Sequence, residues 1–108
     1  MIETQWTTVA NEGDFAADDR VRADVDGTAL TVFRVEGEYF AIADQCTHAR
    51  ASLSQGLIVG KTVMCPLHGA AFDLTSGAAL TLPAVKGVKT FPVRVEGGAV
   101  QVSLGSDA

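Results

Sequence analysis

The chain of 108 residues is long enough for one domain with a single hydrophobic core and too short for two. Hydrophobic residues make up 47% of it and charged residues 19%, which is typical of a folded protein rather than a disordered one. The net charge of -5 argues against a nucleic-acid partner, because a phosphate backbone is held mainly by clustered Lys and Arg. The same acidity is common in cytoplasmic proteins, and it can also steer a protein toward a basic partner surface.

The termini and the apolar runs indicate a cytoplasmic protein that does not enter a membrane. No apolar run approaches the ~20 residues that span a bilayer. The first residues, MIETQWTTVANEGD, include an acid and polar side chains where a signal peptide has a basic start and an apolar stretch. In the cytoplasm, two cysteines are more often metal ligands or catalytic groups than a structural disulfide.

The elements expected along the chain are short strands joined by tight turns, after one possible helical turn in NEGDFAADD. Val21, Ala23 and Val25 alternate with charged residues, the pattern of a half-buried strand. Many such strands with Gly-rich turns predict an all-β domain covering residues 1–108. The expected hairpin turns are Asp26-Gly27, Gly37, Gly60-Lys61 and Gly97-Gly98. The expected core aromatics are Trp6, Phe15, Phe33, Phe40 and Phe91.

Every cysteine and histidine of the chain lies in the stretch CTHARASLSQGLIVGKTVMCPLHG. They form two pairs, Cys46/His48 and Cys65/His68, separated by sixteen residues. Each pair follows a predicted strand, YFAIADQ for the first and KTVM for the second, so each is carried on a loop at a strand end. Two such loops can face each other and present four ligands to one site.

Several chemistries use these residue types. A Cys2His2 zinc site takes the same ligands, but zinc-finger spacing groups the cysteines together and then the histidines. A disulfide leaves the histidines unexplained, and a Cys–His nucleophile needs only one cysteine. If the four side chains were buried and unreactive, their arrangement in two pairs would be accidental. A two-iron, two-sulfur centre with thiolates on one iron and imidazoles on the other takes one of each from each loop.

The motif C-x-H followed by C-x-x-H resembles that of Rieske iron–sulfur proteins. The similarity continues through ASLSQG, AFDLTSGAAL and LPAVKGVKTFPVRVEGGAVQV, so the whole chain resembles the small Rieske ferredoxins of bacterial ring-hydroxylating dioxygenase systems. This resemblance implies a Rieske-like fold of stacked antiparallel β-sheets, with a cluster-binding subdomain at about residues 45–83. It also implies one [2Fe-2S] cluster, with Cys46 and Cys65 on the inner iron and His48 and His68 on the outer iron.

The resemblance further implies a one-electron carrier that is not an enzyme by itself. The implied donor is an NAD(P)H-dependent flavoprotein reductase, and the implied acceptor is a terminal aromatic-ring dioxygenase. Two alternatives stay open. The chain has the size of the small Rieske-type subunit of an assimilatory nitrite reductase, and a zinc-stabilised binding module without redox function is a candidate of a different class.

Departures from the high-potential members of the family indicate a low reduction potential. Rieske proteins of respiratory and photosynthetic complexes carry a disulfide between the two ligand loops, where this chain has Ala51 and Leu67. They also place hydroxyl donors after the second histidine, where this chain has Ala70 and Phe72. Donors aimed at sulfur stabilise the reduced cluster, so we expect a potential near the low end of the family range of roughly -150 to +300 mV.

Overall fold

The computed structural model describes residues 6–16, 19–44, 52–66, 69–81 and 87–104. Its regular elements are strands and two short 3-10 helices, which confirms the all-β prediction. In chain order they are β1 (Thr7–Asn11), η1 (Glu12–Phe15), β2 (Arg20–Val25), β3 (Thr28–Val35), β4 (Glu38–Ala43), η2 (Leu53–Gln55), β5 (Leu57–Val59), β6 (Thr62–Met64), β7 (Ala71–Asp73), β8 (Thr90–Phe91), β9 (Val93–Glu96) and β10 (Ala99–Val102). No helix in these described ranges is long and apolar enough to cross a bilayer.

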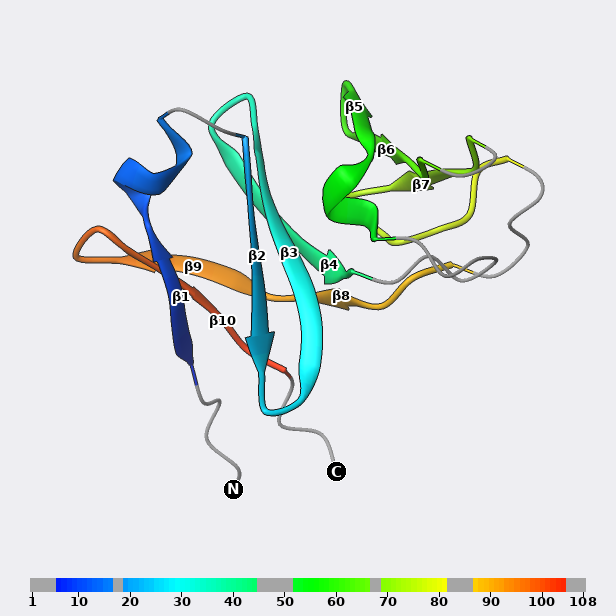
Figure 1. The fold of residues 1–108 in the computed structure, drawn as a ribbon. Coiled ribbons are helices and arrows are strands. Elements are labelled where there is room, and N and C mark those ends of the chain that lie inside the picture. The colour runs from blue at the N-terminus through cyan, green and yellow to red at the C-terminus, as the bar shows by residue number, and fades with distance from the viewer. Residues whose placement is uncertain (1–5, 17–18, 45–51, 67–68, 82–86, 105–108) are drawn as a thin grey trace.

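The strands form three antiparallel sheets, with orders β1-β10-β9, β2-β3-β4-β8 and β5-β6-β7. We call them the outer, middle and small sheets. Figure 1 shows the small sheet beyond β4, on the side away from β1 and β10. The chain passes from the middle to the outer sheet at Pro92, which lies between β8 and β9.

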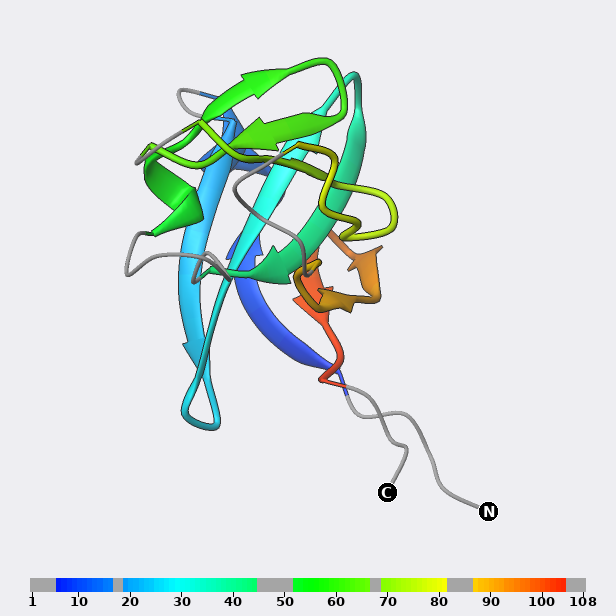
Figure 2. The same cartoon turned by 90° about the vertical axis from the view of Figure 1, so that its right-hand side faces the viewer.

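The middle sheet is buried on both faces because its side chains alternate between two cores. Leu30, Val32 and Ala41 pack with Val100 and Val102 of the outer sheet. The alternate residues of β3 and β4 face the small sheet. There, Phe33 and Ile42 pack with Val63 and Phe72. Figure 2 looks from the side that carries the small sheet, and the middle sheet lies behind it. The expected stacking of antiparallel sheets is confirmed.

Two tight turns fix the register of the middle sheet. Asp26 and Gly27 have positive φ angles of 49° and 81°, and Glu36 and Gly37 have 52° and 81°. Two-residue turns with both central residues in this region match the twist of an antiparallel hairpin. The resulting register pairs Arg22 with Thr31 across β2 and β3. The expected turns at Gly60-Lys61 and Gly97-Gly98 also join paired strands.

The aromatic residues follow the core prediction with one exception. Phe15, Phe33 and Phe91 are buried, and Phe40 packs partly buried against the core beside the small sheet. Trp6 is only half-buried, and the guanidinium of Arg94 lies 4.6 Å from the centre of its ring. The prediction for Trp6 was wrong because its ring has a surface cation–π partner that strand alternation does not reveal. The extent of the domain, residues 1–108, stays a prediction.

Candidate metal centre

The β6–β7 connection positions the second cysteine. Cys65 follows β6 directly, and its backbone N–H donates to the carbonyl of Ala70 at 2.7 Å. The N–H of Gly69 in turn donates to the carbonyl of Cys65 at 3.2 Å. Gly69 has a φ of 70°, a conformation that a residue with a Cβ rarely adopts. These bonds close the base of the connection whose sequence contains His68.

Cys65 lies at the edge of an apolar core rather than in a polar pocket. Cys65 is 2% exposed and forms no disulfide within the described residues. It belongs to the same buried cluster as Ala70, Phe72 and Leu53. Ala70 and Phe72 are both fully buried and carry no hydroxyl, as the argument for a low potential requires. A thiolate in such surroundings suits a soft metal, because apolar packing keeps water from the sulfur.

The other predicted ligands, Cys46, His48 and His68, lie outside the described residues. Within the described ranges, no group of three His, Cys, Asp or Glu side chains could hold a metal ion. Cys65 is the one predicted ligand that the structure describes, and its buried apolar setting fits a thiolate ligand of an iron–sulfur group. The four-ligand site as a whole stays a prediction.

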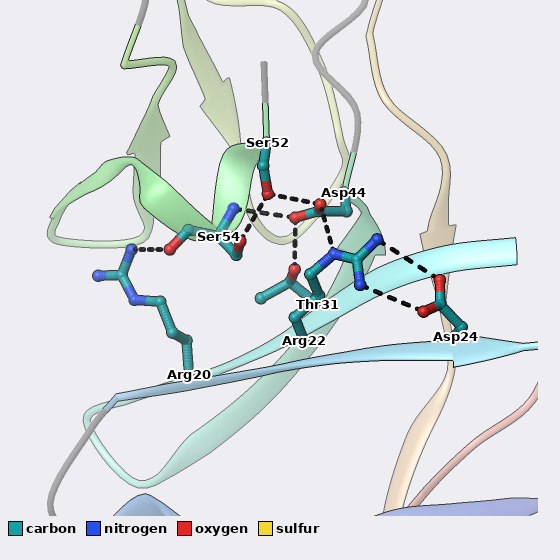
Figure 3. Close-up of polar contacts among 7 residues, drawn as sticks. All are labelled: Arg20, Arg22, Asp24, Thr31, Asp44, Ser52 and Ser54. Carbon is teal, nitrogen blue, oxygen red and sulfur yellow. Dashed lines mark hydrogen bonds and ion pairs between the residues drawn. The ribbon is translucent and has the colours of Figure 1, made fainter. Parts of the chain in front are cut away.

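A buried carboxylate lies two positions before Cys46 in the sequence, and the sequence reasoning missed it. Asp44 is 4% exposed and accepts hydrogen bonds from Thr31 Oγ1 at 2.7 Å and Ser52 Oγ at 2.5 Å. It also accepts from the backbone N–H of Ser54 at 2.9 Å and from Arg22 Nε at 3.0 Å (Figure 3). Burial by itself raises the pKa of Asp44, but the four donors outweigh it and hold that pKa below its ordinary value.

Two arginines of β2 reach toward η2. Arg22 bridges Asp44 and Asp24, with its Nη1 3.2 Å from the second carboxylate. Arg20 donates from Nη1 to the carbonyl of Ser54 at 3.0 Å and to the carbonyl of Gly56. Arg20 thus binds the segment that follows the first predicted pair, and Arg22 binds Asp44, which precedes that pair in the sequence (Figure 3).

The alternation of side chains along the strands could have indicated the buried site of Asp44. Asp44 extends the alternation of Phe40 and Ile42, so it falls on the face that meets the small sheet rather than on a solvent face. Thr31 lies on the same face of β3 and is fully buried. A carboxylate on a buried face needs donors, and Thr31 and Arg22 are the nearby candidates.

An ion pair joins the small sheet to β4, and a hydrogen-bonded turn follows β7. Lys61, in the β5–β6 turn, lies 2.9 Å from a carboxylate oxygen of Glu38 on β4. The hydrogen bond to Glu38 raises the pKa of Lys61 above its ordinary value. After β7, Asp73 accepts from the N–H of Thr75 at 2.8 Å and, through its carbonyl, from that of Gly77 at 2.7 Å. These two bonds stabilise the turn at the end of β7.

Comparison with known proteins places this arrangement in a family. Residues 5–92 match the model of the Rieske [2Fe-2S] domain. The ferredoxin component of naphthalene 1,2-dioxygenase/salicylate 5-hydroxylase systems of Ralstonia sp. is 36% identical over 99 residues, covering 92% of this chain and 95% of that protein. A chain from the complex of reduced oxygenase and oxidized ferredoxin in carbazole 1,9a-dioxygenase matches with 32% identity and a TM-score of 0.87, over 98% and 99% of the two chains. A Mycobacterium tuberculosis protein described as an NADH-dependent nitrite reductase small subunit matches with 26% identity and a TM-score of 0.86, over 97% and 99%.

Proposed function

The chain belongs to the Rieske [2Fe-2S] domain family, and from that premise we propose that it is the ferredoxin of an aromatic-ring dioxygenase system. It takes single electrons from an NAD(P)H-dependent flavoprotein reductase and delivers them to a terminal ring-hydroxylating oxygenase in the cytoplasm. It transfers electrons and catalyses no reaction on a substrate. The observation that carries this proposal is the end-to-end match with a ferredoxin component, over 92% of this chain and 95% of that protein.

Four residues would hold the cluster: Cys46 and Cys65 through their thiolates, and His48 and His68 through their imidazoles. Such a cluster supplies a one-electron couple whose potential is raised by the two neutral imidazoles relative to a centre held by four thiolates. The chain's own contribution begins with Cys65, which is fixed by its backbone bonds to Ala70 and Gly69. The apolar side chains around Cys65 keep water and hydroxyl donors away from its sulfur.

Ala70 and Phe72 give the direction of the potential. Neither residue can donate a hydrogen bond from its side chain, so the extra negative charge of the reduced state receives no help from them. The potential is therefore placed toward roughly -150 mV, the low end for this type of centre. A carrier at that potential accepts electrons from a reduced flavin and is poorly suited to oxidising a quinol.

The test is an anaerobic redox titration followed by electron transfer to each partner class. We expect a red-brown protein with a one-electron transition at low potential. It should be reduced by NADH through a ferredoxin reductase of a naphthalene dioxygenase system and reoxidised by the matching oxygenase. The rate should fall as salt is added, because transient electron-transfer contacts are small and rely on charge. A colourless protein with no transition would refute the proposal and favour zinc.

A second function is favoured by one observation, the high TM-score of 0.86 to the protein described as a nitrite reductase small subunit. That match shares 26% of its residues, whereas the ferredoxin component shares 36%. A nitrite reductase catalytic subunit provides the discriminating partner. Stable co-purification with it, together with no electron transfer to an oxygenase, would favour the nitrite reductase subunit over the ferredoxin.

A further inference from the structure

Asp44 and Ser52 stand at the two ends of residues 45–51, the segment that we call the first ligand loop because it contains Cys46 and His48. The carboxylate of Asp44 accepts from the hydroxyl of Ser52 at 2.5 Å, which joins one end to the other. The backbone carbonyl of Asp44 accepts from the N–H of Leu53 at 2.6 Å. One residue therefore closes the base of the loop through both its side chain and its main chain.

The same carboxylate ties this closure to the middle sheet. Thr31 donates to it from β3, and Arg22 donates to it from β2. These two residues are paired across the strands, so their positions are set by the hairpin register. The backbone N–H of Ser54 completes the set from η2. Asp44 thus joins β2 and β3 to the residues that follow the first ligand loop (Figure 3).

Burial makes these bonds strong and their loss costly. The side chain of Asp44 is 5% exposed, whereas that of Asp24, which shares Arg22 with it, is 63% exposed. Hydrogen bonds to a charged group in a low-dielectric setting contribute more than neutral ones, and a buried group left without a partner is destabilising. Asp44 and Asp24 both bind Arg22, but only Asp44 also binds a residue that flanks the first ligand loop. Asp24 therefore serves as a control for Asp44.

We propose that Asp44 is a positioning residue for the iron–sulfur centre. It ties the residues on either side of the first ligand loop to the middle sheet, and this tie determines how firmly the cluster is retained. The inference rests on the proposed function, since it assumes that Cys46 and His48 bind the cluster. Asp44 contacts neither iron nor sulfide in this proposal and acts only through the loop.

The first experiment compares Asp44→Asn with Asp24→Asn in the full-length, cluster-loaded protein. Dithionite and an excess of bathophenanthroline are added, and iron release is followed by absorbance. The amide keeps the shape of the carboxylate but cannot accept from all four donors. We expect Asp44→Asn to release iron about tenfold faster than wild type, because local opening becomes easier when charge-assisted bonds are lost. Asp24→Asn should release iron at the wild-type rate.

A general loss of stability is separated from loop positioning by Val100→Ala. Val100 is fully buried in the core between the middle and outer sheets, on the opposite face of the middle sheet from Asp44. Unfolding midpoints in urea rank the variants by global stability. Val100→Ala shows how much a given loss of global stability speeds iron release. Asp44→Asn should release iron faster than its own loss of stability accounts for on that scale. It should also shift the g-values of the reduced protein in electron paramagnetic resonance, which Val100→Ala should leave unchanged.

Thr31→Val and Ser52→Ala provide a second test if Asp44→Asn cannot be obtained as folded protein. Each removes one donor, so each should accelerate iron release by a smaller factor than Asp44→Asn. Iron release from Asp44→Asn at the rate of Asp24→Asn, or no faster than global stability explains, would overturn the positioning role alone. Wild-type rates of iron release from both Thr31→Val and Ser52→Ala would overturn that role as well. A wild-type protein that binds no iron and sulfide would instead overturn the proposed function, and this inference with it.

Discussion

The two faces of the middle sheet are built from the same strands but carry different kinds of side chain. The face toward the outer sheet is apolar, with Leu30, Val32 and Ala41 packed against Val100 and Val102. The face toward the small sheet combines apolar residues such as Phe33 and Ile42 with the buried polar pair Thr31 and Asp44. The first face holds the sheets together, and the second also anchors the segments beside the predicted ligands. Buried polar groups cost stability unless they are bonded, so the fully bonded carboxylate of Asp44 on the second face indicates a specific task there.

The largest effect should come from removing Cys65 on the small-sheet side. Cys65→Ser keeps the size of the side chain but replaces a thiolate ligand by a hydroxyl, which soft iron–sulfur sites bind poorly. We expect the purified variant to be colourless, with almost no bound iron and sulfide, as measured by visible absorption and iron analysis. The variant should still show the β-rich circular dichroism spectrum supported by the core on the other face. A red-brown Cys65→Ser protein with wild-type iron content would contradict the assignment of Cys65 as a ligand.

A large effect on stability without an effect on the site should come from the opposite face. Val100→Ala removes two methyl groups from a fully buried side chain and should lower the free energy of unfolding by about 2 kcal/mol. The visible spectrum and reduction potential of the loaded protein should stay unchanged, because Val100 packs in the core away from Cys65. Urea unfolding and redox titration measure the two quantities. A shifted potential would show that the two faces are coupled.

A moderate effect on the potential should follow from adding a hydroxyl near Cys65. Ala70→Ser supplies a donor beside the predicted cluster, and it should raise the reduction potential by about 50–100 mV if the donor meets a sulfur atom. Ala41→Ser is the control, because Ala41 is also buried but lies on the other face. That control should lower stability and leave the potential unchanged. Equal potentials in wild type and Ala70→Ser would contradict the argument that missing donors keep the potential low.

Local patterns predicted much of this division between the faces. The alternation of Val21, Ala23 and Val25 located β2, and Asp26-Gly27 located its turn. The two-residue turns at Asp26-Gly27 and Glu36-Gly37 also fix the register. The pairing of Arg22 with Thr31 then follows by counting residues outward from the first turn. The ligand pairs were visible from residue type and spacing. All four ligands remain predictions, and Cys65, the one that the structure describes, lies in an apolar setting that suits its predicted role.

The contacts of Asp44 with Ser52 and Ser54 could not be predicted in the same way. They depend on how the chain returns to the middle sheet after the first ligand loop, and no local rule gives that path. Arg20 presents the same difficulty, because two of its partners are the backbone carbonyls of Ser54 and Gly56, more than thirty positions away along the chain. Alternation showed that Arg20 and Arg22 lie off the apolar face of β2. It did not show that this second face is covered, so the pattern alone indicates solvent-exposed residues at both positions.

The smallest effect should come from the ion pair at the edge of the small-sheet side. Lys61 and Glu38 are 47% and 59% exposed, so solvent screens their attraction, and Lys61→Met should lower the melting temperature by no more than about 2 °C. The methionine keeps an aliphatic chain near the ring of Phe40, which Lys61 covers at 6.0 Å.

The pH dependence of that small difference identifies its cause. Because folding raises the pKa of Lys61, its contribution is fully present below the ordinary value of 10.5 and is lost as the pH rises through the folded-state value. The gap in melting temperature between wild type and Lys61→Met should therefore be constant at neutral pH and close above pH 10.5. Added salt at neutral pH should narrow it as well. A gap that persists at high pH and high salt would assign the role of Lys61 to packing on Phe40 instead of charge.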